Sequence, residues 1–210
     1  MASEWLIGIL DAIALNLGQR RDELDKLDEA IGDGRLGGDL LSCIEAIEAE
    51  AADIGSLSPP AAIRRMAALL RENTTTEAPR FLAVVLDGMA ERAGDDRPAP
   101  SGVARMLEGG VGALERTGEV ELGMKSMYDV LQPLSKGFSA AVQGGHDDGL
   151  DNLAISICAH TMHRTRDMPA RRRNVDFADD AGLGHMDPGA CAVALIVGAI
   201  VGEVARFNEA

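Results

Sequence analysis

Two aspartates five residues apart stand in a glycine-rich segment near the N-terminus. Asp28 and Asp33 lie within residues 27–39, which also hold four glycines. Glycine lets a backbone fold tightly, so these carboxylates can converge on one hard cation, and magnesium uses one or two protein carboxylates beside water and phosphates. The segment leads into a predicted helix near Gly37, whose free N–H groups would favour a phosphate. The alternative is a plain Asp/Gly turn between helices.

A second candidate is the segment 184–190, which reads Gly-His-Met-Asp-Pro-Gly-Ala. Asp187 is suited to cap a helix and Pro188 to occupy its first turn, so helix structure alone explains both residues. Gly189 is harder to explain, because glycine inside a helix costs ~1 kcal/mol relative to alanine. We interpret it as a position that lets a ligand approach the first turn closely.

A third candidate is the segment 123–131, where Lys125, one of three lysines in the chain, lies at a predicted helix start. The helix dipole disfavours a cation at this end unless an anionic partner is present. Met127 follows at helical spacing, where methionine more often belongs to the core than to a ligand contact.

A basic segment interrupts the acidic chain with five arginines in ten residues: Arg164, Arg166, Arg171, Arg172 and Arg173. It is either a solvated stretch or a contact for a phosphate or an acidic partner. His160 and His163 lie three residues apart and could share a metal, but no further ligand stands at useful spacing. The sequence holds no catalytic triad order, Walker loop or dinucleotide fingerprint.

Helices must position these segments, because apolar residues repeat at three- and four-residue steps almost everywhere, which predicts an all-α fold. We expect eight helices, near residues 5–17, 39–52, 59–70, 78–92, 101–116, 125–143, 151–168 and 187–206. The mostly short connections favour antiparallel neighbours, in either a solid bundle or a ring.

Length and composition limit the function classes. The 210 residues have room for one domain and show no internal repeat, so residues 1–210 are interpreted as a single domain. A formal net charge of −14 disfavours a nucleic-acid partner. The three scattered cysteines fit a reducing cytoplasm, and the longest uncharged run, residues 188–202, is too short to span a bilayer. We therefore expect a cytoplasmic protein without a membrane partner.

Taken together and in this order, the first three segments resemble the nucleotide-binding L subunit of dihydroxyacetone kinases. They also resemble the corresponding domain of the single-chain, ATP-dependent kinases of small keto sugars. The resemblance covers the length of the chain: an acidic glycine loop after the first helix, Gly-x-Lys-Ser-Met-x-Asp past the middle, and Gly-His-x-Asp-Pro-Gly-Ala opening the last helix. The chain is thus identified as a divergent member with one L-type (DhaL-like) domain over residues 1–210.

This resemblance implies a closed ring of eight antiparallel helices that binds ADP or ATP across one end. It implies two magnesium ions, which hold the phosphates through three loop aspartates. The sugar would be held on a separate K-type subunit, so this chain would need a partner, and the phosphate would come from ATP or from a phosphotransferase protein.

The resemblance also assigns roles to individual residues. Asp28 and Asp33 match two metal aspartates, and Gly37 matches the glycine that opens the phosphate-facing helix. The positions that match nucleotide contacts are Met127, Asp187, Pro188 and Gly189.

Several positions depart from the family pattern. The third metal aspartate is Arg35, which could clamp a phosphate in place of one metal, or form an internal ion pair with Asp28 or Asp33 that closes the pocket. Glu77 stands where a phosphate-side serine belongs, within residues 74–79. The remaining departures are Leu36, Asp39, Met124 and Ala181.

Two functional hypotheses follow. In the first, the chain is an L-type subunit that transfers phosphoryl to a small keto sugar held on its partner, through positioning and charge neutralisation. In the second, it is a non-catalytic binding or regulatory relative with a degenerate magnesium site, which docks through its loop end and the basic segment.

Overall fold

The structure, a computed structural model, describes residues 2–74, 76–96, 98–171 and 180–209. Within these ranges the chain forms ten α-helices, one 3₁₀ helix and no strand, which confirms the all-α class. The elements are α1 (Ala2–Gln19), α2 (Arg21–Asp28), α3 (Leu36–Ala49), α4 (Ala51–Ser56), α5 (Pro59–Asn73), α6 (Glu77–Arg92), α7 (Pro100–Arg116), α8 (Tyr128–Gln143), α9 (Leu150–Arg164), η1 (Thr165–Asp167) and α10 (Pro188–Glu209).

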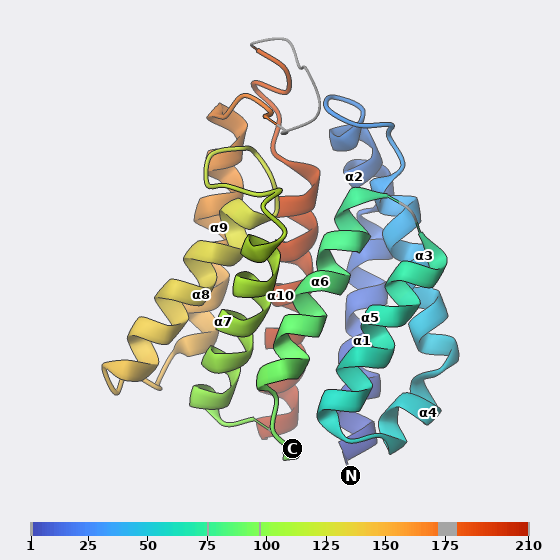
Figure 1. Ribbon diagram of the computed structural model, residues 1–210, viewed down its shortest axis with the longest axis vertical. Helices are drawn as coiled ribbons and strands as arrows, with labels where there is room; N and C mark the ends of the chain where they lie inside the picture. The colour runs from blue at the N-terminus through green and yellow to red at the C-terminus, as the bar shows by residue number, and fades with distance from the viewer. Residues whose placement is uncertain (1, 75, 97, 172–179, 210) are drawn as a thin grey trace.

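The long helices run side by side along the molecule, and both chain termini lie at one end (Figure 1). Each long helix packs against the next in the order α1, α3, α5, α6, α7, α8, α9, α10, and α10 packs in turn against α1. The N-terminal ends of α3, α6, α8 and α10 therefore all lie at the end opposite the termini, which we call the loop end (Figure 1). This alternation brings helix starts from distant parts of the sequence together.

The expected number of eight helices is wrong for the described residues, because two short helices were missed. α2 has eight residues and buries only Leu24 and Asp28, so it lacks the repeating apolar pattern that marks a long helix. It occupies part of the stretch that the sequence indicated as a loop. α4 has six residues and buries only Ile54.

Helix bounds near the third segment also differ from the expectation. α8 begins at Tyr128 rather than near residue 125, because Lys125 has a φ of 62°, which an α-helix does not allow. α9 ends at Arg164 and is followed by the 3₁₀ turn Thr165–Asp167, so the predicted helix to residue 168 is shorter than expected.

The core is aliphatic, as the low aromatic content requires. One cluster centres on α1, α3 and α5, a second on α6, α7 and α8, and α10 contributes to both. α6 and α7 approach especially closely, because a Cβ on Gly88 would clash with the backbone oxygen of Gly109, and a Cβ on Gly109 with that of Gly88. Only glycine at both positions permits this helix separation.

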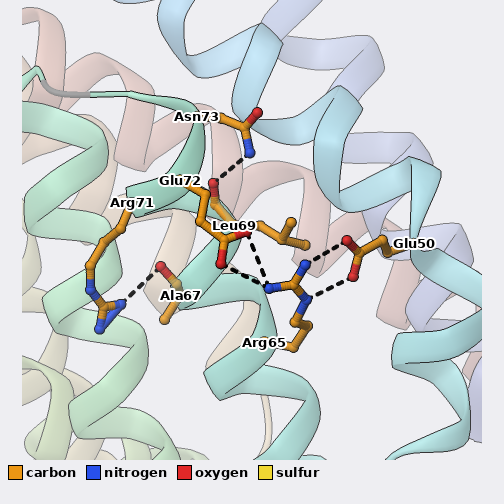
Figure 2. Close-up of polar contacts among 7 residues, drawn as sticks. All are labelled: Glu50, Arg65, Ala67, Leu69, Arg71, Glu72 and Asn73. Carbon is orange, nitrogen blue, oxygen red and sulfur yellow. Dashed lines mark hydrogen bonds and ion pairs between the residues drawn. The ribbon is translucent and has the colours of Figure 1, made fainter.

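An ion-pair cluster ties α5 to the junction of α3 and α4 (Figure 2). Arg65 donates from Nε and Nη2 to both oxygens of Glu50 at 2.7 and 2.6 Å, and from Nη1 to Glu72 at 3.1 Å. The hydrogen bonds to Glu50 and Glu72 raise the pKa of Arg65, and the guanidinium lowers the pKa of Glu50. The side chains are about one-third exposed or more, so this cluster orients α4 and contributes only modestly to stability.

Within the described residues, α10 is long and apolar enough to cross a membrane by length and composition alone. This corrects the expectation from the 15-residue uncharged run, which is too short to span a bilayer. The apolar stretch Pro188–Phe207 is longer, and its mean hydropathy is 2.0 even though it includes Glu203 and Arg206. α10 packs against α1, α8 and α9 and buries small side chains such as Ala190, Ala192 and Ala199. In all, 33% of the most apolar window of this helix is buried inside the structure.

Candidate functional site

A cavity of about 200 Å³ lies at the loop end of the molecule. Its walls come from four places: the loop between α2 and α3 with the start of α3, the start of α6, the two residues before α8, and the first turn of α10. The lining residues are Asp28, Gly32, Asp33, Leu36, Asp39, Thr76, Glu77, Ala78, Phe81, Ser126, Met127, Asp187, Pro188 and Gly189.

The cavity brings together residues from all three sequence segments that were singled out for chemistry. Asp28, Asp33, Met127, Asp187, Pro188 and Gly189 line it, whereas Gly37 and Arg35 do not. The start of α6 adds Thr76 and Phe81, which the sequence interpretation did not single out. Thr76 lies within residues 74–79, the segment whose Glu77 departs from the family pattern, and Phe81 lies two residues after that segment.

Asp28 holds the first loop in shape. It is 9% exposed, and its Oδ2 accepts the backbone N–H groups of Gly34 at 2.9 Å and Arg35 at 3.2 Å. A Cβ on Gly32 would clash with this carboxylate. The carboxylate of Asp28 therefore stabilises an Asp/Gly turn, the structural alternative for this segment. The same side chain also lines the cavity.

Arg35 forms an ion pair with Asp33 at the protein surface. Its Nε and Nη2 lie 3.0 and 2.8 Å from Asp33 Oδ2, and both side chains are more than half exposed. This hydrogen bond raises the pKa of Arg35. Of the alternatives open from the sequence, the structure shows the internal pair with Asp33, but the cavity beside it remains.

Gly37 lies behind the cavity rather than in its wall. Its N–H donates to Asp25 Oδ1 at 2.7 Å, and the N–H of Gly38 donates to the same atom at 3.2 Å. A Cβ on Gly37 would clash with the backbone oxygen of Arg21, so this glycine permits the close approach of α2 and α3. The sequence interpretation missed Asp25, since it lies in the unexpected helix α2.

The start of α10 forms another wall of the cavity. Asp187 is 3% exposed, and its Oδ1 accepts the N–H of Ala190 at 2.6 Å, which is the cap that the sequence predicted. Its own N–H donates to Thr165 Oγ1 at 2.8 Å. A Cβ on Gly189 would lie 3.2 Å from Asp187 Oδ1 and 3.4 Å from Met127 Cβ, so a side chain at this position would have little spare room beside Asp187.

At Lys125, where the sequence left open whether an anionic partner is present, the hydrogen bonds within the described residues go to backbone carbonyl groups. Its Nζ donates to three backbone carbonyl oxygens, and the side chain is 2% exposed. Burial lowers the pKa of Lys125, while the fields of Asp187, Asp167 and Asp129 act in the opposite direction. Lys125 is not among the residues that line the cavity.

Five carboxylates line this cavity: Asp28, Asp33, Asp39, Glu77 and Asp187. Oδ2 of Asp39 is buried without a hydrogen-bond partner in the structure. Among the described residues no three His, Cys, Asp or Glu side chains form a metal-binding group. Carboxylate oxygens are the kind of donor that suits a magnesium ion taking most of its ligands from phosphates and water.

The other candidates from the sequence do not join the cavity. Arg166 donates from Nε to the carbonyl of Gly184 at 2.9 Å and so holds the loop before α10. Arg172 and Arg173 lie outside the described residues, as does Thr75. His160 and His163 belong to no group of three potential metal ligands in the described part of the chain.

The fold and the cavity define an all-α domain with an acidic site at converging helix starts, and comparison with known proteins identifies its family. Residues 30–202 match the DAK2 domain. The chain belongs to the DAK2-domain family, which confirms the resemblance to dihydroxyacetone kinases.

Two kinds of relative are similar to this chain. The PEP-dependent dihydroxyacetone kinase 1, ADP-binding subunit DhaL, of Listeria innocua is 22% identical over 203 residues, which cover 94% of this chain and 95% of that protein. The triokinase/FMN cyclase of Mus musculus is 26% identical over 205 residues, which cover 96% of this chain and 35% of that protein. The chain thus spans nearly the whole subunit but only about a third of the longer enzyme.

The fold is similar to that of a solved structure. The dihydroxyacetone kinase of C. freundii in its native form matches with a TM-score of 0.72 at 18% identity, over 94% of this chain and 34% of that one. The same enzyme in complex with AMP-PNP and Mg²⁺ matches with a TM-score of 0.73 over 33% of its chain. At this identity, the match shows that the helical fold is shared.

Proposed function

We propose that this chain is the nucleotide-binding subunit of a dihydroxyacetone-type kinase, which binds ADP or ATP with magnesium in the cavity at the loop end. The observation that carries the proposal is the convergence of residues from the three motif segments, with Asp28, Met127 and Gly189 on the walls of one cavity. The full-length similarity to an ADP-binding subunit supports it.

The cavity is lined by both apolar and acidic side chains, a mixture that suits a nucleotide. Leu36, Phe81, Met127 and Pro188 supply apolar surface for an adenine ring. The carboxylates, chiefly Asp28 and Asp33 with Asp39, would hold magnesium, which neutralises phosphate charge when bound. Without that cation, the acidic lining would repel a di- or triphosphate.

In this proposal Arg35 is the second cation, beside magnesium, that neutralises phosphate charge. It pairs with the exposed Asp33, and an exposed pair contributes little stability, so the guanidinium can exchange Asp33 for a phosphate at low cost. Guanidinium groups bind phosphate oxygens bidentately. One magnesium ion and Arg35 would then serve where the family pattern uses two metal ions.

The proposal extends to architecture and partners. The sequence of helix contacts from α1 through α10 and back to α1 supports an eight-membered ring of long helices, with α2 and α4 as additions. The sugar would be held on a K-type partner in the cytoplasm, and the transferred phosphate would come from ATP or from a phosphotransferase protein. Positioning and charge neutralisation would be this chain's contribution to the transfer.

Hydrogen exchange with ADP and magnesium tests where the ligand binds. We expect slower amide exchange in residues 28–36, 76–81, 126–128 and 187–190, and unchanged exchange in α4 and the first turns of α5, which lie at the other end of the molecule. Protection confined to a different surface would contradict the assignment of the cavity.

The non-catalytic alternative is favoured by one observation, the Arg35–Asp33 ion pair that occupies a predicted metal ligand. An assay with a K-type subunit, dihydroxyacetone, ATP or a phosphotransferase donor, and magnesium separates the two functions. Formation of a sugar phosphate supports the kinase subunit. A stable complex that phosphorylates no triose or tetrose with either donor supports the regulatory alternative.

A further inference from the structure

Lys125 is buried in an unusual backbone conformation just behind the cavity. It has the only positive φ, 62°, of any non-glycine residue in the described part of the chain. Side chains with a Cβ disfavour this region, so such a residue persists only where its surroundings hold it. The side chain is 2% exposed, which is rare for lysine.

The ammonium group of Lys125 has a complete set of hydrogen-bond partners. Its three N–H donors go to the carbonyl oxygens of His185 at 2.5 Å, Thr165 at 2.6 Å and Met168 at 3.2 Å. Thr165 and Met168 lie at the C-terminal end of α9 and η1, where carbonyl groups favour a cation. His185 lies in the loop that leads into α10.

These contacts join two walls of the cavity through one side chain. Ser126 and Met127, which directly follow Lys125, line the cavity on one side. Asp187, two residues after His185, lines it on another. Lys125 therefore connects the wall before α8 to the wall at the start of α10 by a charge-assisted hydrogen bond.

The first loop also reaches this junction. Gly182 has a φ of 71°, and a Cβ there would lie 2.9 Å from Lys125 Cε and would clash with Ile31. Ile31 lies between Asp28 and Asp33 in the first loop. Three segments that form the cavity thus meet around Lys125.

We propose that Lys125 is the positioning residue of this cavity: by binding the three carbonyl groups, it fixes the wall at Ser126–Met127 relative to the wall at Asp187–Gly189 and thereby sets ligand affinity. The identity of the ligand, ADP, rests on the proposed function. Lys125 acts through its neighbours and touches no ligand.

The test uses Lys125→Met, which keeps the length of the side chain and removes the ammonium group. Lys136→Met on α8 is the matched control, because Lys136 is exposed. We expect amide exchange in residues 126–128 and 187–190 to accelerate together by at least tenfold in Lys125→Met and to stay unchanged in the control. ADP affinity in the presence of magnesium should fall by at least tenfold in Lys125→Met alone.

A second variant separates the ammonium group from the backbone strain. Lys125→Gly relieves the positive φ and leaves a space that n-butylammonium, which has the size and charge of the missing side chain, can fill. We expect butylammonium to restore ADP affinity at least fivefold, whereas tetramethylammonium, which has no N–H donor, should not. Equal effects of the two cations would overturn the proposal.

The outcomes distinguish this inference from the proposed function. If the wild-type protein binds no ADP, the proposed function fails. The amide exchange rates of residues 126–128 and 187–190 then still decide the role of Lys125. If the wild-type protein binds ADP but Lys125→Met loosens only one wall, or leaves ADP affinity unchanged, the positioning role is overturned while the proposed function stands.

Discussion

The carboxylate of Asp25 accepts the backbone N–H of Gly37 at 2.7 Å, and so caps the first turn of α3 from the preceding helix. A helix start has unpaired N–H groups that attract either a side chain or an anion. Here Asp25 takes the N–H groups of both Gly37 and Gly38. The start of α3 is therefore stabilised from within the protein, and a phosphate in the cavity must find its donors elsewhere.

Removing this cap should destabilise the protein. We expect Asp25→Ala to lower the free energy of unfolding by about 1 kcal/mol, the usual effect of losing an N-terminal cap. Asp25→Asn keeps an acceptor oxygen and should lose less. Urea unfolding measures both, with Glu45→Ala on the exposed side of α3 as the control. A loss in the control equal to that of Asp25→Ala would contradict this role.

Arg35 should affect nucleotide binding rather than stability. Because its ion pair within the described residues is with the exposed Asp33, we expect Arg35→Ala to leave the unfolding midpoint nearly unchanged and to weaken ADP binding roughly tenfold, through the loss of a charge-assisted phosphate contact. Arg116→Ala, which removes an equally exposed arginine paired with Glu91, is the matched control for titration calorimetry.

The reverse change gives a second readout at the same position. Arg35→Asp adds a carboxylate where the family pattern has one, so ADP binding should become more strongly dependent on magnesium. Unchanged affinity in Arg35→Ala, together with unchanged magnesium dependence in Arg35→Asp, would show that Arg35 has no part in the site.

The contact between α6 and α7 predicts that replacing glycine by alanine has very different effects on stability at neighbouring positions. Gly88→Ala and Gly109→Ala place a methyl group against the facing backbone, and we expect each to lower the free energy of unfolding by about 2–3 kcal/mol. Gly112→Ala, whose Cβ would meet nothing nearer than Arg116 Nη1 at 3.5 Å, should instead be neutral or stabilise by up to about 1 kcal/mol. Similar losses in all three variants would contradict the close helix approach.

The all-α fold, and the convergence of the three motif segments at one end of the molecule, could be predicted from the sequence because both depend on local signals. Helical periodicity indicated an all-α chain, and helices that alternate in direction place every second start at the same end. Asp187 with Pro188 was a reliable helix start, since the cap that it predicts is present in the structure. The same local signals did not reveal α2, which is too short to show a periodic apolar face.

The partners of individual polar groups could not be predicted, because they come from distant parts of the chain. The sequence left open whether Lys125 has an anionic partner, and its hydrogen-bond acceptors are backbone carbonyls at residues 165, 168 and 185, which carry no sequence signal. Likewise, Gly37 fits a phosphate-binding helix start in sequence, whereas its N–H is taken by Asp25. Glycine spacing shows where the backbone comes close to something, but the sequence does not identify what that is.

Because of its buried cysteines, the protein should lose stability as the pH rises into the alkaline range. Burial raises the pKa of Cys158 and of Cys191 to about 12, and that of Cys43 to about 11. Unfolded thiols ionise near pH ~8.5, so above that pH the unfolded chain binds fewer protons than the native one, and the free energy of unfolding falls as pH rises. Each thiol should lower the free energy of unfolding by roughly 1 kcal/mol per pH unit between about pH 9 and 11.

Urea unfolding at pH 8, 9 and 10 measures this dependence. In a variant with Cys43, Cys158 and Cys191 all replaced by alanine, the free energy of unfolding should decline less steeply with pH than in the wild-type protein. Parallel declines in the two proteins would show that groups other than these thiols control alkaline stability.

The most direct measurement is calorimetric titration of the purified chain with ADP, with and without magnesium. We predict one binding site per chain, at least tenfold tighter with magnesium, because five carboxylates line a cavity that must also hold phosphates. Asp28→Asn should weaken the magnesium-dependent part, while Asp151→Asn, at the exposed start of α9, should not. The absence of heat at millimolar ADP even in the presence of magnesium would contradict the account.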